Sequence, residues 1–495
     1  MTAPRPVKRV VIAGGGTAGW VTAAALVRHL GKLVDITLVE SDAIGTVGVG
    51  ESTIPTARTF HQLIGLDEAA FMRASGASFK LGISFENWRT EGDTYFHSFG
   101  SVGRSVLLAD FQHFWLEAKQ RGFGGDLDDY SLEAQAAAAG KFATGPESTL
   151  AYAYHLDATA YARFLRSLAE PAGVRRLEGR IVEVAQDGET GLVEALVLES
   201  GERIEGDLFI DCTGFRSLLV GGAMGQAFED WGDWLRTDSA LVVQTEGVGP
   251  PVPYTRVIAH RAGWRWRIPL QHRVGNGLVF ASGAMSDDDA RTALDGAIEG
   301  AMVSEPRLIR FRPGYREPWV GNCVAIGLSG GFLEPLESTS IHLLMIAATR
   351  LIQLFPIGGV TPALAERFNA QTRREWEHVR DFLVMHYALN ERDDSDFWRD
   401  YRAMELPPAL AERIALFRDA AAAYQDTDEL FRIDSWVQVM LGQGITPVSH
   451  HPIPRMMATP QLEEALGNLR AGIAAQVSRM PSQRDFIAGY CAAAA

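Results

Sequence analysis

One short segment limits the fold of this chain more than any other: Gly14-Gly-Gly-Thr-Ala-Gly19, a glycine-rich turn between two regular elements. The residues before it, Arg9–Ala13 (RVVIA), form a continuously apolar run, which predicts a strand buried on both faces. Trp20–Leu30 follows with the composition of a helix, and Asp35–Glu40 (DITLVE) is the next strand-like run. This order predicts a right-handed, parallel strand–helix–strand unit of an α/β fold.

The spacing of this turn, G-x-G-x-x-G, is typical of a site for a dinucleotide. Gly14 would make the tight turn, Gly16 would let the backbone approach a pyrophosphate, and Gly19 would allow close packing of the helix on the strand. The helix N-terminus offers unpaired N–H groups to the phosphates, and Glu40 follows about twenty residues on, where a carboxylate can bind ribose hydroxyls. A glycine-rich turn without a ligand is the alternative, and the motif by itself does not separate NAD from FAD.

Two later segments favour FAD over NAD. Asp211-Cys-Thr-Gly214 follows one strand-like run, and Val324-Ala-Ile-Gly327 follows another. In large FAD enzymes such late turns return the chain to the flavin, whereas an NAD domain is usually complete within one contiguous stretch. We therefore predict a doubly wound, FAD-binding core of the glutathione-reductase or aromatic-hydroxylase type, assembled from about 1–95, 150–235 and 315–361.

The remaining segments predict an antiparallel sheet and a helical region. Four strand-like runs (SALVVQT, TRVIAH, WRWRIPL and GLVFAS) lie between Ser239 and Ser282, and Gly275-Asn-Gly277 contains the Asn-Gly pair favoured in tight hairpins. After about Pro362 the chain is helical and charged. We expect residues 1–361 to hold the FAD core and an antiparallel substrate module, and residues 362–495 to form a C-terminal helical region that contributes to the substrate site.

Charge and cysteine content limit the partners of such a fold. A formal net charge of −15 and a pI near 5.3 disfavour nucleic acid and anionic membranes, which bind clustered Lys and Arg. The three cysteines, Cys212, Cys323 and Cys491, give neither a disulfide framework nor a paired metal-ligand spacing, so we predict no metal site. With no signal-peptide pattern and no apolar run of spanning length, we expect a cytoplasmic protein with a small, weakly charged ligand.

Three further segments carry a family resemblance: Gly48-Val-Gly-Glu-Ser52 with Thr53-Ile-Pro55, Trp264-Arg-Trp-Arg-Ile-Pro269, and Leu333-Glu-Pro-Leu-Glu-Ser-Thr339. Together with the glycine-rich turn, they resemble the flavin-dependent tryptophan-halogenase family over roughly residues 8 to 345. The match is weaker in the C-terminal helical part. The resemblance implies a flavin-covering loop, the W-x-W-x-I-P signature of the family, and an active-site turn beside the isoalloxazine.

The resemblance also implies an activity. Reduced FAD reacts with oxygen to give a C4a-hydroperoxide, chloride or bromide attacks it to form hypohalous acid, and this oxidant halogenates an indole or another electron-rich ring. A separate NAD(P)H:flavin reductase is the implied partner, and a homodimer is among the assemblies that the sequence allows. The implied flavin contacts are Gly14, Gly15, Gly16, Ala18, Gly19, Glu40, Ser41, Ile44, Val49, Gly50, Ser52, Val182, Gly327, Leu328 and Ile341.

Lys80, in the run Phe79-Lys-Leu-Gly-Ile-Ser-Phe-Glu-Asn-Trp88, matches the catalytic lysine of the family. An amine can hold hypohalous acid by hydrogen bonding or by becoming a haloamine, and burial makes a lysine a better amine because it disfavours the charged form. Most lysines lie at the surface, so composition alone leaves both locations open. In an extended run, alternation would place Lys80 opposite Phe79 and Leu81.

Glu337 matches the family residue that stabilises the cationic ring intermediate and accepts its proton. Glu334 is its rival, with a structural pairing at the turn as the alternative role, and we favour Glu337 because it directly precedes Ser338. The resemblance implies that Thr339 and the backbone N–H of Ser340 hold the halide. Many relatives carry Gly in place of Ser340, so the φ angle here must suit a residue with a Cβ.

Four aromatic or imidazole side chains are expected near the substrate. Trp264 and Trp266 stand two apart on a predicted strand and share a face, which the resemblance places along the tunnel between flavin and substrate; a plain core role is the alternative. His97 and Phe99 match residues that stack against the indole, and a structural histidine is the alternative.

In tryptophan-specific members, a C-terminal stretch with paired tyrosines, a Glu and a Phe-Trp pair grips the amino acid. The corresponding residues here, 423–436, hold one tyrosine, and Leu430-Phe431 stands where Phe-Trp is expected. Phe431 is the expected substrate contact in this stretch. Because a zwitterion needs charged partners that this set does not reproduce, we predict that free tryptophan is a poor substrate and that indole, a substituted indole or a larger indole-bearing molecule is preferred.

Three other functions remain open on the sequence alone. A flavin-dependent aromatic hydroxylase shares the FAD fold but usually needs no lysine relay. A non-catalytic flavin-binding protein has no use for both Lys80 and Glu337. An NAD-dependent dehydrogenase is least favoured, because no acid–base pattern of that class follows the first motif.

Overall fold

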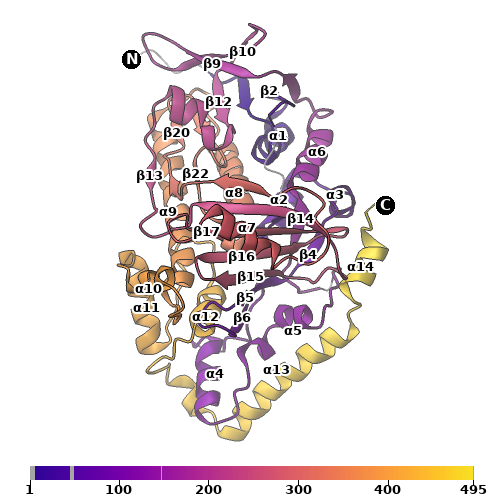
Figure 1. The fold of residues 1–495 in the computed structure, drawn as a ribbon, viewed down its shortest axis with the longest axis vertical. Helices are drawn as coiled ribbons and strands as arrows, with labels where there is room; N and C mark the ends of the chain where they lie inside the picture. Colours follow the sequence, from indigo (N-terminus) through magenta and orange to yellow (C-terminus); the bar gives the residue numbers. More distant parts are fainter. Residues whose placement is uncertain (1–5, 45–49, 107, 147, 494–495) are drawn as a thin grey trace.

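The computed structural model describes residues 6–44, 50–106, 108–146 and 148–493, and it contains the predicted parallel sheet (Figure 1). The strand order of this sheet is β20-β21-β12-β1-β2-β8. All neighbouring pairs from β21 to β8 are parallel, and the edge strand β20 is antiparallel to β21. In sheet order the strands span Trp319–Val320, Cys323–Ala325, Leu208–Asp211, Arg9–Ala13, Asp35–Glu40 and Arg175–Glu178.

Alternate residues of β1 face the two sides of this sheet. Val10 and Ile12 pack in the core that contains α1, α6 and α8, whereas Val11 and Ala13 pack against the antiparallel meander β9-β10-β11. The predicted FAD-type core is therefore confirmed, with helices on one face and the meander on the other. These elements span Thr17–Leu30, Ala158–Ala169, Ser340–Gln353, Ile181–Gln186, Val193–Leu198 and Arg203–Glu205.

A second, seven-stranded sheet has the order β18-β14-β17-β16-β15-β5-β6. Its strands β14 to β17 confirm the antiparallel runs predicted between Ser239 and Ser282. The strands β5 and β6 come from the early part of the chain and extend the sheet through the parallel pairing of β5 with β15. In sheet order the strands span Arg307–Arg310, Ser239–Glu246, Arg273–Phe280, Gly263–Pro269, Thr255–His260, Gly82–Glu86 and Thr94–Ser98.

The hairpin turn predicted at Gly275-Asn-Gly277 is wrong. These residues lie inside β17, and residues 270–272 connect it to β16. The two glycines serve close approaches instead, because a Cβ on Gly275 would lie 2.9 Å from the Cα of Gly50, and one on Gly277 would lie 2.0 Å from the ring of Trp266. They make room for a neighbouring strand and a tryptophan.

Smaller elements connect the two large sheets. The three-stranded sheet β3-β7-β4 contacts the seven-stranded sheet through β3, which lies against β16 and β17. The other small sheet is β13-β19-β22. These strands span Gly50–Ser52, Ala153–Asp157, Ser78–Lys80, Glu229–Asp230, Gly314–Tyr315 and Gly331–Phe332, and the helices α2 to α5 and α7 span Thr56–Ile64, Glu68–Ser75, Phe111–Gln120, Leu132–Ala138 and Asp287–Asp295.

From Pro362 onward the regular elements of the described residues are helices, as predicted. The helices α9 and α12 bring this region to the seven-stranded sheet, where α12 packs on β6, and α13 runs along the lower edge of the molecule to α14 (Figure 1). The helices α9 to α14 span Pro362–Ala388, Asp396–Ala403, Pro408–Ala420, Ile433–Gly442, Thr459–Arg479 and Gln483–Tyr490. Among the described residues, no helix is both long and apolar enough to cross a membrane.

Candidate active site

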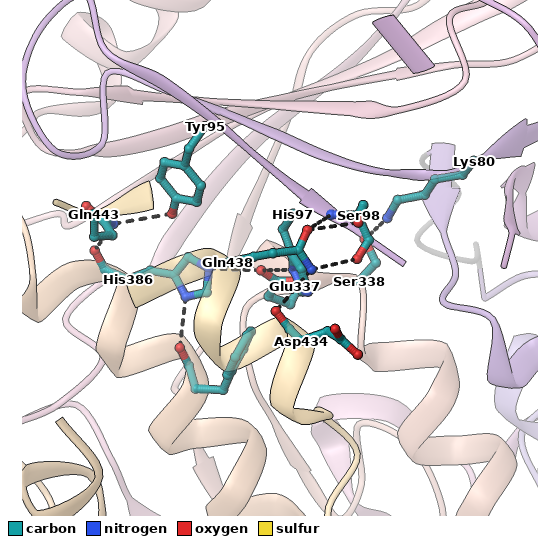
Figure 2. A network of polar contacts seen from close by, with 11 residues as sticks. Lys80, Tyr95, His97, Ser98, Glu337, Ser338, His386, Asp434, Gln438 and Gln443 are labelled. Atoms are coloured by element: carbon teal, nitrogen blue, oxygen red, sulfur yellow. Dashed lines mark hydrogen bonds and ion pairs between the residues drawn. The ribbon is translucent and has the colours of Figure 1, made fainter. Parts of the chain in front are cut away.

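Lys80 ends the short strand β4, and its side chain is fully buried. Its neighbour Phe79 packs into an aromatic cluster on the other face, which confirms the predicted alternation. Lys80 Nζ donates a hydrogen bond to Ser338 Oγ at 2.8 Å (Figure 2). It also lies 4.9 Å from the centre of the Phe99 ring. Burial lowers the pKa of Lys80 to about 7, although the nearby charge of Glu337 acts to raise it. Near neutral pH the side chain is therefore a mixture of amine and ammonium.

The hydrogen-bond partner of Lys80 lies in the tight turn before α8. Pro335–Glu337 form one turn of 3-10 helix, and Ser338 has a left-handed backbone with φ of 60°. Ser340 meets the condition placed on its φ angle, because it begins the right-handed helix α8, where a Cβ fits. Thr339 is buried, and its Oγ1 has no hydrogen-bond partner among the described residues.

Glu337 has no exposed surface and lies between two imidazole rings (Figure 2). His97 Nδ1 lies 3.0 Å from Glu337 Oε1 and 2.9 Å from Oε2, and His386 Nε2 lies 2.9 Å from Oε1. Burial acts to raise the pKa of Glu337, but the nearby charges of His97 and His386, together with the hydrogen bond from His97, outweigh it and lower the pKa to about 2. Glu337 is therefore ionised at neutral pH, and with Lys80 it lies in one buried cluster.

Glu334, the rival carboxyl group, has different partners. It is fully buried and accepts hydrogen bonds from the hydroxyl groups of Thr237 and Tyr387. Burial raises the pKa of Glu334 to about 7, and the two hydroxyl donors offset this only in part. Glu334 is therefore paired with two hydroxyl groups at the turn, which is the structural role that the sequence left open for it.

Aromatic side chains surround this cluster. Trp264 and Trp266 share one face of β16 and are buried, with ring centroids 5.7 Å apart. Phe431 is buried and stacks on Phe382 at 3.6 Å, and its ring lies 6.3 Å from that of His97. Phe431 and His97, both predicted substrate contacts, are thus brought together from opposite parts of the chain.

Residues 423–436 correspond to the stretch that grips the amino acid in tryptophan-specific members, and polar contacts join several of them to one another and to Arg413. Glu429 is buried, and its carboxylate accepts hydrogen bonds from Arg413 at 3.2 Å and from Trp436 Nε1 at 2.9 Å. The Arg413 guanidinium also lies 4.0 Å from the Trp436 ring and 4.1 Å from the Tyr424 ring. The charge of Glu429 is therefore already paired with a buried cation.

Three neighbouring strand ends form the edge at which a dinucleotide would bind. The strands β1, β12 and β21 are parallel neighbours, so the turns at Gly14, Gly214 and Gly327 lie along one edge of the sheet. A Cβ on Gly14 would lie 2.3 Å from the Cys212 carbonyl oxygen, whereas a Cβ on Gly16 would meet no protein atom within 4 Å. Open space beside Gly16 and a helix N-terminus without a side-chain cap fit a pyrophosphate.

The other predicted flavin contacts lie around this edge or farther along the surface. The carboxylate of Glu40 accepts hydrogen bonds from Arg176 and Trp20, and a Cβ on Gly15 would overlap it. Ile44 and Val182 are exposed, at 51% and 56%. Gly19, Gly50, Ser52 and Ile341 are buried, Ala18, Ser41 and Leu328 are partly exposed, and Val49 lies outside the described residues.

A model of the tryptophan halogenase family matches residues 9–459. This chain belongs to the tryptophan halogenase family. Tryptophan 7-halogenase RebH of Lentzea aerocolonigenes is 34% identical, over 97% of this chain and 98% of its own. Two solved flavin-dependent halogenases are similar as well. Xcc4156 from Xanthomonas campestris has a TM-score of 0.98 and 52% identity, over 99% of this chain and 100% of its own. BrvH from Brevundimonas sp. BAL3 has a TM-score of 0.94 and 46% identity, over 98% of this chain and 99% of its own.

Membership of the tryptophan halogenase family confirms the predicted class of activity. The chain is a flavin-dependent halogenase, an oxidoreductase with FAD as its cofactor, and the aromatic hydroxylase alternative is not favoured. A small aromatic substrate is consistent with this class. Within the described residues, no group of three or more His, Cys, Asp or Glu could hold a metal ion.

Two residues of this halogenase site were missed by the sequence reasoning. His386 contacts Glu337 from α9, and Arg413 pairs with Glu429 from α11. Both lie on helices whose apolar residues predict only a packed face, and neither residue belongs to a recognised motif. The signal that could have identified them is long-range pairing, which a single sequence does not contain.

Proposed function

We propose that this halogenase attaches a halogen to an indole ring by receiving hypohalous acid at Lys80 and the ring proton at Glu337. The observation that carries the proposal is the buried cluster in which Lys80 Nζ bonds to Ser338, the residue next to Glu337. Near pH 7 part of Lys80 is neutral amine and Glu337 is ionised before it accepts a proton, and an electrophilic substitution can use both groups.

Bound reduced FAD supplies, with oxygen and a halide, the hypohalous acid for this site. Lys80 holds this oxidant by a hydrogen bond or as a haloamine, and the Phe99 ring beside its Nζ keeps the amine in apolar surroundings. In the hydrogen-bonded form, the carbon–halogen bond forms as the halogen–oxygen bond breaks, the hydroxide takes a proton from the Lys80 ammonium and leaves as water, and the displaced ring proton passes to Glu337. In the haloamine form, water has left when the nitrogen–halogen bond formed, and the nitrogen keeps that bond's electron pair when the halogen moves to the ring. Because both side chains are shielded from solvent, the oxidant is directed to the ring.

For the halide we propose a site at Thr339 and Ser340. The Thr339 hydroxyl is buried and has no hydrogen-bond partner in the described part of the chain. Ser340 is the first residue of α8, so its backbone N–H lies at the helix N-terminus. The N-terminus of a helix favours an anion because its first N–H groups are unpaired. Chloride or bromide suits this donor pair, since both accept hydrogen bonds from a hydroxyl and an amide.

The substrate we propose is indole or an indole without a free amino-acid group. His97 and Phe431 offer ring faces beside Glu337, which suits an aromatic plane. The Glu429 carboxylate is held by Arg413 and Trp436, so binding an ammonium group would require breaking a buried ion pair. Parallel assays of indole and free tryptophan test this directly: we expect efficient turnover of indole, and efficient turnover of tryptophan would refute it.

Two further features of the protein belong to the proposal. A separate NAD(P)H:flavin reductase would supply FADH2, as the resemblance to the halogenase family implies. We place the chain in the cytoplasm, because its three cysteines are free and buried, as suits a reducing compartment. A homodimer is the assembly that we would test first.

The activity is tested by the mass of the product. Purified protein is mixed with FAD, NADH, a flavin reductase, bromide and indole, and the control omits bromide. We expect bromoindole only when bromide and oxygen are both present. A hydroxylated indole that forms whether or not bromide is added would contradict the proposal.

A further inference from the structure

His386 lies on α9 with no exposed surface, and both of its ring nitrogens face oxygen atoms. Its Nδ1 lies 2.8 Å from the Phe382 carbonyl oxygen, and its Nε2 lies 2.9 Å from Glu337 Oε1 (Figure 2). The N–H direction at Nε2 misses this oxygen, so the contact with Glu337 is an ion pair rather than a directed hydrogen bond. His386 neither gives nor receives an atom in the proposed transfer of the halogen from Lys80 or of the ring proton to Glu337.

The hydrogens of this ring follow from its two partners. A carbonyl oxygen can only accept, so Nδ1 carries a hydrogen. A neutral ring has only one N–H, and its second nitrogen would then present a lone pair to the negative charge of Glu337. The repulsion is removed if His386 carries hydrogen on both nitrogens, or if Glu337 is protonated. His97 raises no such conflict, because its Nδ1 donates to Glu337 and its Nε2 has no hydrogen-bond partner among the described residues.

The surroundings of the contact favour the doubly protonated ring. His97 Nδ1 donates a hydrogen bond to Glu337 Oε2 at 2.9 Å, which favours the ionised carboxylate and leaves the second proton on His386. No other cation faces His386 among the described residues: Lys80 reaches the cluster through Ser338. His386 also contacts the Gln443 side chain, through its own carbonyl oxygen, and the rings of Phe85, Trp88 and Phe382. The other titratable groups that act on Glu337 are Tyr95 and His97 on β6.

We propose that His386 is a buried imidazolium that keeps Glu337 ionised and fixes the direction of its carboxylate, as a positioning residue for halogenation. Its consequence for catalysis rests on the function proposed above, whereas its charge does not. With His386 as counter-ion, Glu337 needs no second cation, so Lys80 is free to lose its proton. During the reaction the C–H electron pair returns to the ring, the proton moves to Glu337, and His386 keeps both hydrogens.

The charge of His386 can be measured without any turnover. In the full chain labelled with 15N-histidine, we expect one buried ring with imidazolium shifts at about pH 8, where an ordinary histidine is neutral. This signal should be absent from His386→Gln, and in Glu337→Gln it should become that of a neutral ring because the counter-ion is gone. A neutral signal for His386 in the unmodified protein would overturn the proposal.

Three variants separate the charge from the hydrogen bond and from the fold. His386→Gln keeps an N–H donor without the charge, His386→Leu keeps neither, and Tyr387→Phe alters only the adjacent contact with Glu334. We expect bromination of indole to fall at least about tenfold in His386→Gln and further in His386→Leu. Flavin binding and hypobromous acid formation should be unchanged in both, and Tyr387→Phe should brominate like the unmodified protein.

The outcomes distinguish this proposal from the function on which it rests. An ordinary histidine, with a pKa of about 6.5, is neutral over most of the range between about pH 6 and 9. Unchanged bromination by His386→Gln throughout this range overturns the positioning role. Unchanged bromination by Glu337→Gln instead overturns the role of Glu337 itself. In that case the 15N signal still decides whether His386 is charged.

Discussion

Glu334 and Glu337 are buried in the same turn, yet their carboxyl groups have opposite protonation preferences. The partners of Glu334 are the hydroxyl groups of Thr237 and Tyr387, and burial raises its pKa to about 7. Burial acts in the same direction on Glu337, but His97 and His386 lower its pKa to about 2. Two identical side chains are thereby fitted for different tasks, one as a structural acid and one as a proton acceptor.

The first prediction compares the matched pair Glu337→Gln and Glu334→Gln. Glu337→Gln removes the proton acceptor, so we expect the halogenation rate to fall by about 10²–10⁴-fold. Glu334→Gln keeps an acceptor for Tyr387 and adds a donor for Thr237, so its rate should stay near that of the unmodified protein. Single-turnover product formation with pre-reduced flavin measures both. A larger loss in Glu334→Gln would reverse the assignment of the two carboxyl groups.

The second prediction concerns stability and pH. The folded state binds the Glu334 proton more tightly than the unfolded state, because burial raises its pKa from 4.5 to about 7. This contribution to stability is present in full below about pH 4.5 and is lost as the pH rises through 7, an effect of about 3 kcal/mol. Urea unfolding at acid and alkaline pH measures the free energy of unfolding at each pH. Between the two, Glu334→Gln should lose less of this free energy than the unmodified protein. An equal loss in both proteins would contradict the raised pKa.

The third prediction concerns the pH dependence of halogenation. Burial lowers the pKa of Lys80 to about 7, so the neutral amine increases as the pH rises through 7. If the amine is the reactive form, the rate should rise up to about tenfold per pH unit below 7 and level off above it. A rate that falls across this range would show that the ammonium, acting through a hydrogen bond, is the working form.

The fourth prediction separates two glycines of the dinucleotide motif. A Cβ on Gly16 meets no protein atom, so Gly16→Val should fold normally and bind FAD at least about tenfold more weakly, a loss of roughly 1.4 kcal/mol. A Cβ on Gly14 would lie 2.3 Å from the Cys212 carbonyl oxygen, and its φ is 103°, so Gly14→Ala should lose about 1–3 kcal/mol of stability. Flavin titration and thermal unfolding measure the two effects. Tight FAD binding by Gly16→Val would place the pyrophosphate elsewhere.

The parts of the fold that depend on local pattern could be predicted from the sequence. The strands at Arg9–Ala13 and Asp35–Glu40 were predicted with the bounds that the structure gives, because continuous burial and a glycine-rich turn are local signals. The burial of Lys80 and its separation from Phe79 followed from alternation along an extended run together with the family resemblance.

The parts that depend on contacts between distant segments could not be predicted. Gly275-Asn-Gly277 has the composition of a turn, but it lies inside a strand because Gly50 and Trp266 need the space of the missing side chains. The contact of His386 with Glu337 joins a helix to a turn, and nothing in the sequence around either residue indicates it. The left-handed backbone conformation in the active-site turn occurs at Ser338. Because this residue is not a glycine, the sequence does not indicate that conformation.

The most direct test of the account is the reaction of Lys80→Met with bromide, indole and pre-reduced FAD. Methionine keeps much of the length of the side chain but removes the amine, so the variant should bind FAD, consume FADH2 and release hypobromous acid that an added scavenger traps. We expect bromoindole formation to fall by about 10²-fold or more. Bromoindole formed at the unmodified rate by Lys80→Met would contradict the claim that the buried amine delivers the halogen.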